Sequence, residues 1–180
     1  MTTAWTLPST VIQYAEADTH IAWNAKNLSS LISPGSNKAE AVAPLFHIAR
    51  SPKYDLTNKT WYIELTGFDF NNVPNTISGV TAKIQMDRGG RVVDETIMLT
   101  YQGEMIGTNM SAGIIDPLTG ASLLAPLTVY GGSADMWEIP NLTKAMVEDA
   151  SFGIVIRYQS HPYWPHKTVP AITSVQLQIS

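Results

Sequence analysis

Apolar and polar residues alternate with a period of two over most of the chain after residue 60. The pattern is clear in residues 61–66, 80–86, 92–101, 152–158 and 174–179. Successive side chains of a strand point to opposite faces of a sheet, so each of these segments predicts a strand with one buried face. The chain is therefore expected to be rich in short β-strands.

Turn residues separate these segments. Gly89-Gly90 lies between two alternating stretches and can supply the positive φ angles of a tight turn. This spacing predicts an antiparallel hairpin between residues 82–87 and residues 92–97. Residues 103–120 are rich in glycine and are expected to form a loop.

The next segments predict an edge strand and a helix. Residues 123–130 predict a strand. Pro126 indicates that this strand lies at an edge or contains a bulge, because proline has no N–H to donate to the hydrogen-bond ladder of a central strand. Asn141 or Thr143 can cap one short helix over residues 143–149. Many short strands with a single short helix are typical of an antiparallel β-sandwich, either jelly-roll or immunoglobulin-like.

The chain is expected to have two parts. Residues 1–55 are irregular and broken by prolines, and they predict an extended N-terminal arm with one or two strands. Residues 56–180 carry the alternating segments and predict the β-sandwich domain. The arm has too little patterned apolar sequence for a core of its own.

Composition excludes several classes of function. Only 14% of the residues are charged, against roughly 25% in an average domain, and the neutral polar residues far outnumber them. The chain carries a formal charge of −4 and no basic cluster, so nucleic acid is not an expected partner. It has no cysteine, no apolar run of membrane-spanning length and no secretory signal at its start. Neither a disulfide nor a membrane partner is expected.

Catalytic and metal-binding patterns are weak. Asp94 and Glu95 are neighbours on one predicted strand and should point to opposite faces, so they cannot act as a catalytic pair. Glu95 is expected near an edge or beside Arg88 or Arg91. No Gly-x-Ser-x-Gly elbow or phosphate-binding glycine loop occurs. The chain is not expected to be an enzyme.

The loop HPYWPH contains the strongest candidates for binding. His161 and His166 could share a metal ion, but a site needs three or four ligands and no third one is indicated, so neither a metal nor a cofactor is expected. Large aromatic side chains in loops often anchor partners or stack on sugars. The candidate partner-binding residues are Trp5, Trp23, Tyr163 and Trp164.

Two stretches carry a pattern that strand alternation does not require. The first runs from Leu65 to Val93 and contains Gly-Phe-x-Phe, and the second runs from Tyr130 to Ile156 and contains Tyr-Gly-Gly-Ser-x-Asp-x-Trp and then Phe-Gly-Ile. The signature residues are Gly67, Phe68, Phe70, Gly131, Gly132, Asp135, Trp137, Phe152 and Gly153. Together the stretches resemble a family of β-sandwich structural proteins of tailed bacteriophages. The chain departs from that pattern at Glu138, where glycine is expected.

The signature also has a physical interpretation. Trp137 is expected to plug one end of the core, and Asp135 to accept backbone N–H groups of its turn. Gly131-Gly132 would permit a sharp exit from the preceding strand. Gly67 would leave room for the two phenylalanines that follow it. Gly153 would let Trp137 or Phe152 pack closely. These roles are architectural and imply no catalytic residue.

The resemblance implies a virion structural protein. Within that class, a capsid decoration or cement protein fits a single small domain without a fibre repeat. Its partners would be the major capsid protein or other virion proteins and further copies of itself, as a dimer or trimer. A tail, neck or baseplate accessory protein is the alternative inside this class. A carbohydrate-binding module that attaches the particle to host glycans is the alternative outside it.

Overall fold

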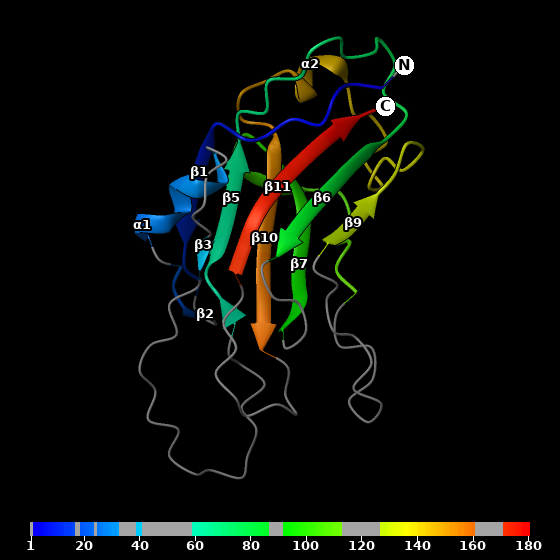
Figure 1. Ribbon diagram of the computed structural model, residues 1–180. Coiled ribbons are helices and arrows are strands. Elements are labelled where there is room, and N and C mark those ends of the chain that lie inside the picture. Colours follow the sequence, from blue (N-terminus) through cyan, green and yellow to red (C-terminus); the bar gives the residue numbers. More distant parts are fainter. Residues whose placement is uncertain are drawn as a thin grey trace, which may run out of the picture.

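The computed structural model describes residues 2–16, 19–23, 25–32, 39–40, 59–86, 92–112, 127–160 and 171–180. In these residues the protein is an all-β sandwich of two sheets, as the alternation predicted (Figure 1). The strands of the two sheets cross at an angle, with the smaller sheet in front in Figure 1. All pairings are antiparallel except the short pairing of β2 with β4.

The larger sheet has seven strands within the described ranges. They are β1 (Thr10–Tyr14), β2 (Thr19–Ile21), β4 (Lys59–Thr60), β5 (Tyr62–Thr66), β7 (Val92–Tyr101), β8 (Glu104–Ile106) and β10 (Gly153–Ser160). β10 is central, because it pairs with β5 and β4 on one side and with β7 on the other. β1 lies outside β5, and β8 lies outside β7.

The smaller sheet has the order β3-β11-β6-β9. Its strands are β3 (Ala39–Glu40), β6 (Val80–Met86), β9 (Leu127–Gly131) and β11 (Ala171–Ile179). β9 is an edge strand, in agreement with the prediction from Pro126, which itself lies outside the described residues. The predicted strands at residues 80–86 and 174–179 are confirmed as β6 and part of β11.

The predicted hairpin between residues 82–87 and 92–97 is wrong. β6 pairs with β11 and β9 in the smaller sheet, whereas β7 pairs with β10 and β8 in the larger one. The chain therefore crosses between the sheets after Met86. Alternation identifies the buried face of a strand but not its neighbour, and two glycines are compatible with either connection.

The region after β7 also differs from the prediction. Residues 103–120 were expected to be a loop, but β8 pairs with β7 in a tight hairpin whose turn is Gln102-Gly103. Both turn residues have positive φ angles, 54° and 82°. This geometry favours Asn-Gly or Gly-Gly, so Gln102 gave little indication of a turn. The part of the loop at residues 113–120 lies outside the described residues.

The helices are short. α2 (Lys144–Val147) is the helix predicted over residues 143–149, and Thr143 caps it by accepting a hydrogen bond from the Met146 amide. Two further helical turns precede β3, namely α1 (Ala25–Leu28) and the 3-10 turn η1 (Ser29–Leu31).

The N-terminal residues contact both sheets. Thr3 and Thr6 donate backbone hydrogen bonds to Ile179 and Leu177 of β11, and β1 then pairs with β5 of the other sheet. The division of the chain at residue 55 stays a prediction, as does the arrangement of residues 41–58, which lie outside the described ranges.

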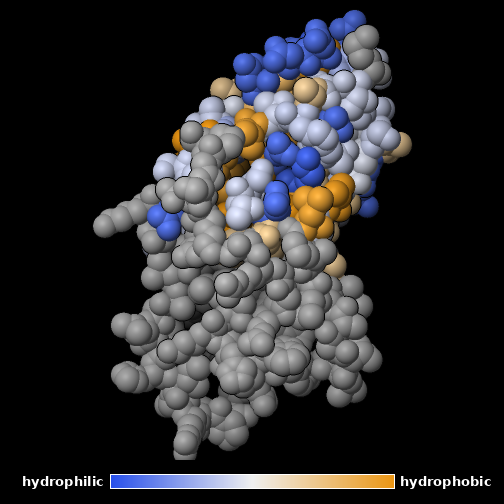
Figure 2. Space-filling view, in the orientation of Figure 1, coloured by the Kyte–Doolittle hydropathy of each residue, from blue (hydrophilic) through white to orange (hydrophobic). Residues whose placement is uncertain are grey.

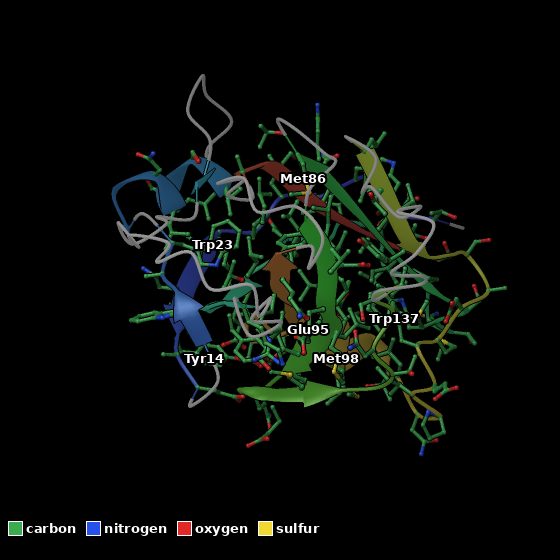
Figure 3. The ribbon with its side chains drawn as sticks, turned by 90° about the horizontal axis from the view of Figure 1, so that it is seen from below. Tyr14, Trp23, Met86, Glu95, Met98 and Trp137 are labelled. Carbon is green, nitrogen blue, oxygen red and sulfur yellow. The ribbon has the colours of Figure 1, made fainter. Side chains whose placement is uncertain are left out.

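The core fills the space between the sheets. The fully buried residues from the larger sheet include Ile63, Leu65, Ile97, Leu99, Ile154 and Ile156. Those from the smaller sheet include Val80, Ala82, Val175, Leu177 and Ile179. Figure 3 looks along the sandwich from below, with Trp23 and Trp137 on opposite sides of this core.

Candidate functional site

Two of the four predicted contact residues lie in the described structure. Trp5 is half-buried, and the Lys83 ammonium lies 4.3 Å from its ring centroid. Trp23 is only 2% exposed, its indole N–H donates to the Trp61 carbonyl over 2.8 Å, and its ring packs on Tyr158. The Trp23 side chain is thus part of the core and is not presented to a partner. Tyr163 and Trp164 lie outside the described residues, so their role stays a prediction.

The second signature stretch surrounds the buried side chain of Trp137. The Trp137 ring is fully buried, and its N–H donates to the Val80 carbonyl over 2.9 Å. Asp135 accepts the Trp137 amide over 2.8 Å, as predicted. Gly131 has φ +70°, and a Cβ there would collide with Val80 and Trp137. Gly132 has open space around it and no positive φ, so the tight exit from β9 depends on Gly131 alone.

The first signature stretch packs against the same end of the core. Phe68 and Phe70 are buried and stacked, with ring centroids 5.9 Å apart, and Phe70 also contacts Phe152 edge-on. Gly67 has φ +69°, and a Cβ there would overlap the Ser9 hydroxyl, so its space is taken by the N-terminal segment.

Gly153 lies against the backbone of a neighbouring strand. A Cβ at Gly153 would collide with the Leu65 carbonyl of β5, the neighbouring strand. Glycine is required there for the close approach of two backbones. The signature residues are architectural in the described structure.

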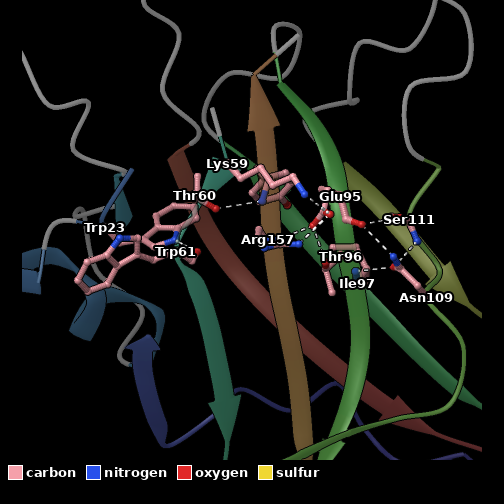
Figure 4. Close-up of polar contacts among 11 residues, drawn as sticks. Trp23, Lys59, Thr60, Trp61, Glu95, Thr96, Ile97, Asn109, Ser111 and Arg157 are labelled. Carbon is pink, nitrogen blue, oxygen red and sulfur yellow. Dashed lines mark hydrogen bonds and ion pairs between the residues drawn. The ribbon is translucent and has the colours of Figure 1, made fainter. Parts of the chain in front are cut away.

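A charged cluster lies on the outer face of the larger sheet (Figure 4). The Arg157 guanidinium binds both carboxylate oxygens of Glu95, with 2.8 Å between Nη2 and Oε1. Lys59 Nζ lies 3.1 Å from the same Oε1, and the Thr96 hydroxyl donates to Oε2. β8 pairs with β7 only at Leu99–Tyr101, so in the described structure Glu95 has β10 on one side and no strand on the other, in agreement with the expected edge position. Its basic partners Arg157 and Lys59 are far from it in sequence and were not predicted, and the predicted partners Arg88 and Arg91 lie outside the described residues.

A β-bulge places Glu95 in this cluster. On β10 the consecutive residues Arg157 and Tyr158 pair with Thr96 and Asp94 of β7, so Glu95 is the extra residue. Asn109 holds the bulge, because its side-chain oxygen accepts the Ile97 amide and its NH2 donates to the Glu95 carbonyl. Since a bulge changes which face a side chain takes, alternation in the sequence could not locate this cluster.

Aromatic rings extend the cluster across three strands. Arg157 lies 4.2 Å from the ring centroid of Tyr62, and Tyr14 stacks on Tyr62 with centroids 5.2 Å apart. Burial, reinforced by Glu64, raises the pKa of Tyr14 to about 12. Burial opposes ionisation of Glu95, but the hydrogen bonds from Arg157, Thr96 and Lys59 outweigh it and lower the pKa of that carboxyl. The charged and aromatic side chains of this face are therefore already paired with one another inside the protein.

Asp94 points into the sandwich, away from Glu95, as predicted for neighbours on a strand. It is 1% exposed, and one carboxylate oxygen accepts the Ala112 amide over 2.9 Å. Among the described residues, the other oxygen and the buried Tyr130 hydroxyl have no hydrogen-bond partner. Burial, together with Asp94, raises the pKa of Tyr158. Asp94 is the one deeply buried carboxylate in the described core.

A shallow pocket of about 390 Å³ lies beside α2. Its two acidic residues, Asp69 and Glu148, are both exposed to solvent. The pocket is lined by Ser9, Gly67, Phe68, Asp69, Phe70, Glu148 and Ala150. This lining contains no basic residue and no histidine, so it offers neither a phosphate-binding group nor an imidazole base.

The outer face of the smaller sheet is different in character. Its central strands present neutral polar side chains, and Lys83, the charged residue among them, is turned over Trp5. The edge strand β9 presents Leu127 and Val129, which are 50% and 54% exposed. Figure 2 shows them as an apolar patch beside the polar centre of this face. We call the outer side chains of β6, β9 and β11 the neutral face.

Further features of the described residues narrow the choice of site. No group of three or more His, Asp or Glu side chains that could hold a metal ion occurs in the described ranges. In the same ranges, no helix has the length and apolarity needed to cross a membrane. No protein-family model matches the chain, and no curated protein matches it. The neutral face is the candidate functional surface.

Proposed function

We propose that this protein is a structural component of a tailed-bacteriophage virion, and that it decorates the capsid by binding between capsomers through the neutral face. The observation that carries the proposal is the combination of half-exposed neutral side chains on β6 and β11 with exposed Leu127 and Val129 on β9. The resemblance of the two signature stretches to phage structural proteins gives the class of assembly.

The chemistry of the neutral face suits broad, repeated contacts. A charged group buried at an interface loses its hydration, and this cost exceeds the gain unless a partner is well placed. Gln85 and Gln176 are neutral and can donate and accept hydrogen bonds without that cost. Interfaces are depleted of charge and include apolar contacts, and this face offers few charges together with the apolar Leu127 and Val129 at its β9 edge.

The aromatic candidates for glycan binding give less support to the alternative. Trp23 is in the core, and Trp5 is covered on one side by Lys83. A sugar-binding platform needs an accessible ring face. In the described residues the neutral face therefore favours protein partners over glycans.

Purified particles provide the test. We expect the protein in purified virions at a copy number in the hundreds, with its density between capsomers in cryo-electron microscopy. A few copies or about a dozen would instead place it at the tail, neck or baseplate. Absence from particles would overturn the proposal.

A binding experiment tests the surface itself. The variant Gln85→Glu/Gln176→Glu places two charges on the neutral face and is expected to weaken binding to particles that lack the protein by about tenfold or more. The control Asn71→Asp/Asn75→Asp adds the same charge at exposed loop positions and should bind normally. Equal binding by both variants would exclude the neutral face as the contact.

A further inference from the structure

Large exposed aliphatic side chains in the described residues are confined to edge strands. Ile12 lies on β1, at the edge of the larger sheet, whereas Leu127 and Val129 both lie on β9. Edge strands of soluble proteins usually carry a charge, a proline or a cover that prevents pairing with another chain. β9 has the sequence LTVYG and carries none of these within the strand.

Within the described residues, one side of the β9 backbone has no partner strand. β9 pairs with β6 alone in the described structure, and Gly132 next to it donates to the Val80 carbonyl. Hydrogen-bonded residues alternate along an antiparallel ladder, so Tyr130 and Thr128 bond toward β6. Leu127 and Val129 consequently direct their backbone N–H and C=O groups to the free edge.

Two copies of β9 related by a two-fold axis would present complementary side chains to each other. If two copies of β9 pair antiparallel with Val129 opposite Val129, the outward backbone groups of both strands meet. In the same register Leu127 lies opposite Gly131, which has no side chain and leaves room for it. The two Val129 and two Leu127 side chains then cover one another on the neutral face.

No like charges meet in this arrangement. The chain carries no charged residue between Asp116 and Asp135. Lys83 lies opposite Val129 on β6, but its ammonium is turned across the sheet to Trp5, whose segment lies beyond β11. A second copy of the same neutral strand therefore meets no repulsion at the axis.

We propose that two copies of this protein pair through β9, antiparallel about a two-fold axis, and join their smaller sheets into one continuous sheet. A two-fold contact uses the same patch on both copies, which the register about Val129 provides. The proposal does not depend on virion binding, although the dimer would present two neutral faces side by side.

Two variants of the full chain test the pairing. Sedimentation should show a dimer for the natural protein, and Val129→Lys, which places two ammonium groups at the axis, should raise the dissociation constant by about 100-fold or more. The control Thr81→Lys adds the same charge on the neutral face, away from the free edge, and should remain a dimer. A monomeric natural protein, or a Val129→Lys variant that still dimerises, would overturn the proposal.

A disulfide reports the register directly, because the chain has no cysteine of its own. Directly opposed hydrogen-bonded residues have Cα atoms about 5.5 Å apart, within the range that a disulfide spans. Val129→Cys should therefore form a covalent dimer under mild oxidation, whereas Gln85→Cys on the neighbouring strand should not. Failure of Val129→Cys to cross-link would reject this register, and it would leave the result of the particle-binding experiment unaffected.

Discussion

The outer faces of the two sheets use their side chains in opposite ways. On the larger sheet, Arg157 and Lys59 bind Glu95, and the ring of Tyr62 packs between Arg157 and Tyr14. On the smaller sheet, neutral side chains lie beside the exposed Leu127 and Val129. In the described structure, the charged groups on the outer face of the larger sheet bind one another. On the smaller sheet, Leu127 and Val129 stay exposed to solvent.

This difference indicates where a partner would bind. An internally paired charge gains little from a new contact, because it would first have to give up its existing partner. An exposed aliphatic side chain gains from any partner that removes it from water. We therefore interpret the charged cluster as a stabilising element and the neutral face as the proposed contact surface.

Replacing Arg157 should give the largest effect. Arg157→Met leaves the partly buried Glu95 with Lys59 as its one cation among the described residues, and we expect the free energy of unfolding to fall by about 3 kcal/mol. Urea denaturation measures this change. The double variant Glu95→Gln/Arg157→Met should recover part of the loss, because no unpaired charge is left. A single variant as stable as the natural protein would show that the cluster does not stabilise the larger sheet.

Replacing Asn109, which holds the bulge at Glu95, should lower the free energy of unfolding by a smaller amount. Asn109→Ala removes the acceptor of the Ile97 amide and the donor to the Glu95 carbonyl, so we expect a loss of about 1.5 kcal/mol. Asn109→Asp keeps the acceptor and should lose less. Amide hydrogen exchange at Ile97 should be faster in the alanine variant, and unchanged exchange would contradict a role in holding the bulge.

Acid should weaken the larger sheet through Glu95. The pKa of Glu95 is lowered in the folded protein, so its contribution to stability is complete above the unfolded value of about 4.5 and is lost as the pH falls through the folded value. Stability curves between pH 7 and pH 3 should therefore fall less steeply for Glu95→Gln than for the natural protein. Parallel curves would mean that another carboxylate governs the acid transition.

Replacing Lys83 on the smaller sheet should give the smallest effect. Lys83→Gln removes the ammonium above the Trp5 ring, a contact worth about 0.5 kcal/mol at an exposed position. The melting temperature should change little. A loss as large as that of Arg157→Met would erase the distinction between the two faces.

Local elements could be predicted from the sequence, and long-range pairings could not. β6, α2 and β11 follow from alternation and a capping threonine, and Trp137 is buried as predicted. The predicted pairing of β6 with β7 was wrong, because periodicity contains no information about which strand lies beside another.

The contacts of the candidate site residues also depend on long-range pairings that could not be predicted from the sequence. Glu95 and Arg157 are 62 positions apart and meet through a bulge that interrupts the alternation. Trp23 was predicted at the surface because an isolated tryptophan in an irregular segment has no visible partner in the sequence. Its hydrogen bond to Trp61, 38 positions away, exists only in the folded chain.

The positions of β10 and β11 constrain how the protein can be made. These strands lie inside the two sheets, and both come after residue 150. While the chain is still emerging from a ribosome, β5 and β7 lack the strand that joins them, and β6 lacks one neighbour. Neither sheet can be completed until residues 153–179 have been synthesised, so folding is expected to be late and cooperative. Until then the apolar strands are exposed, and a cell that produces many copies at once must protect these nascent chains from one another.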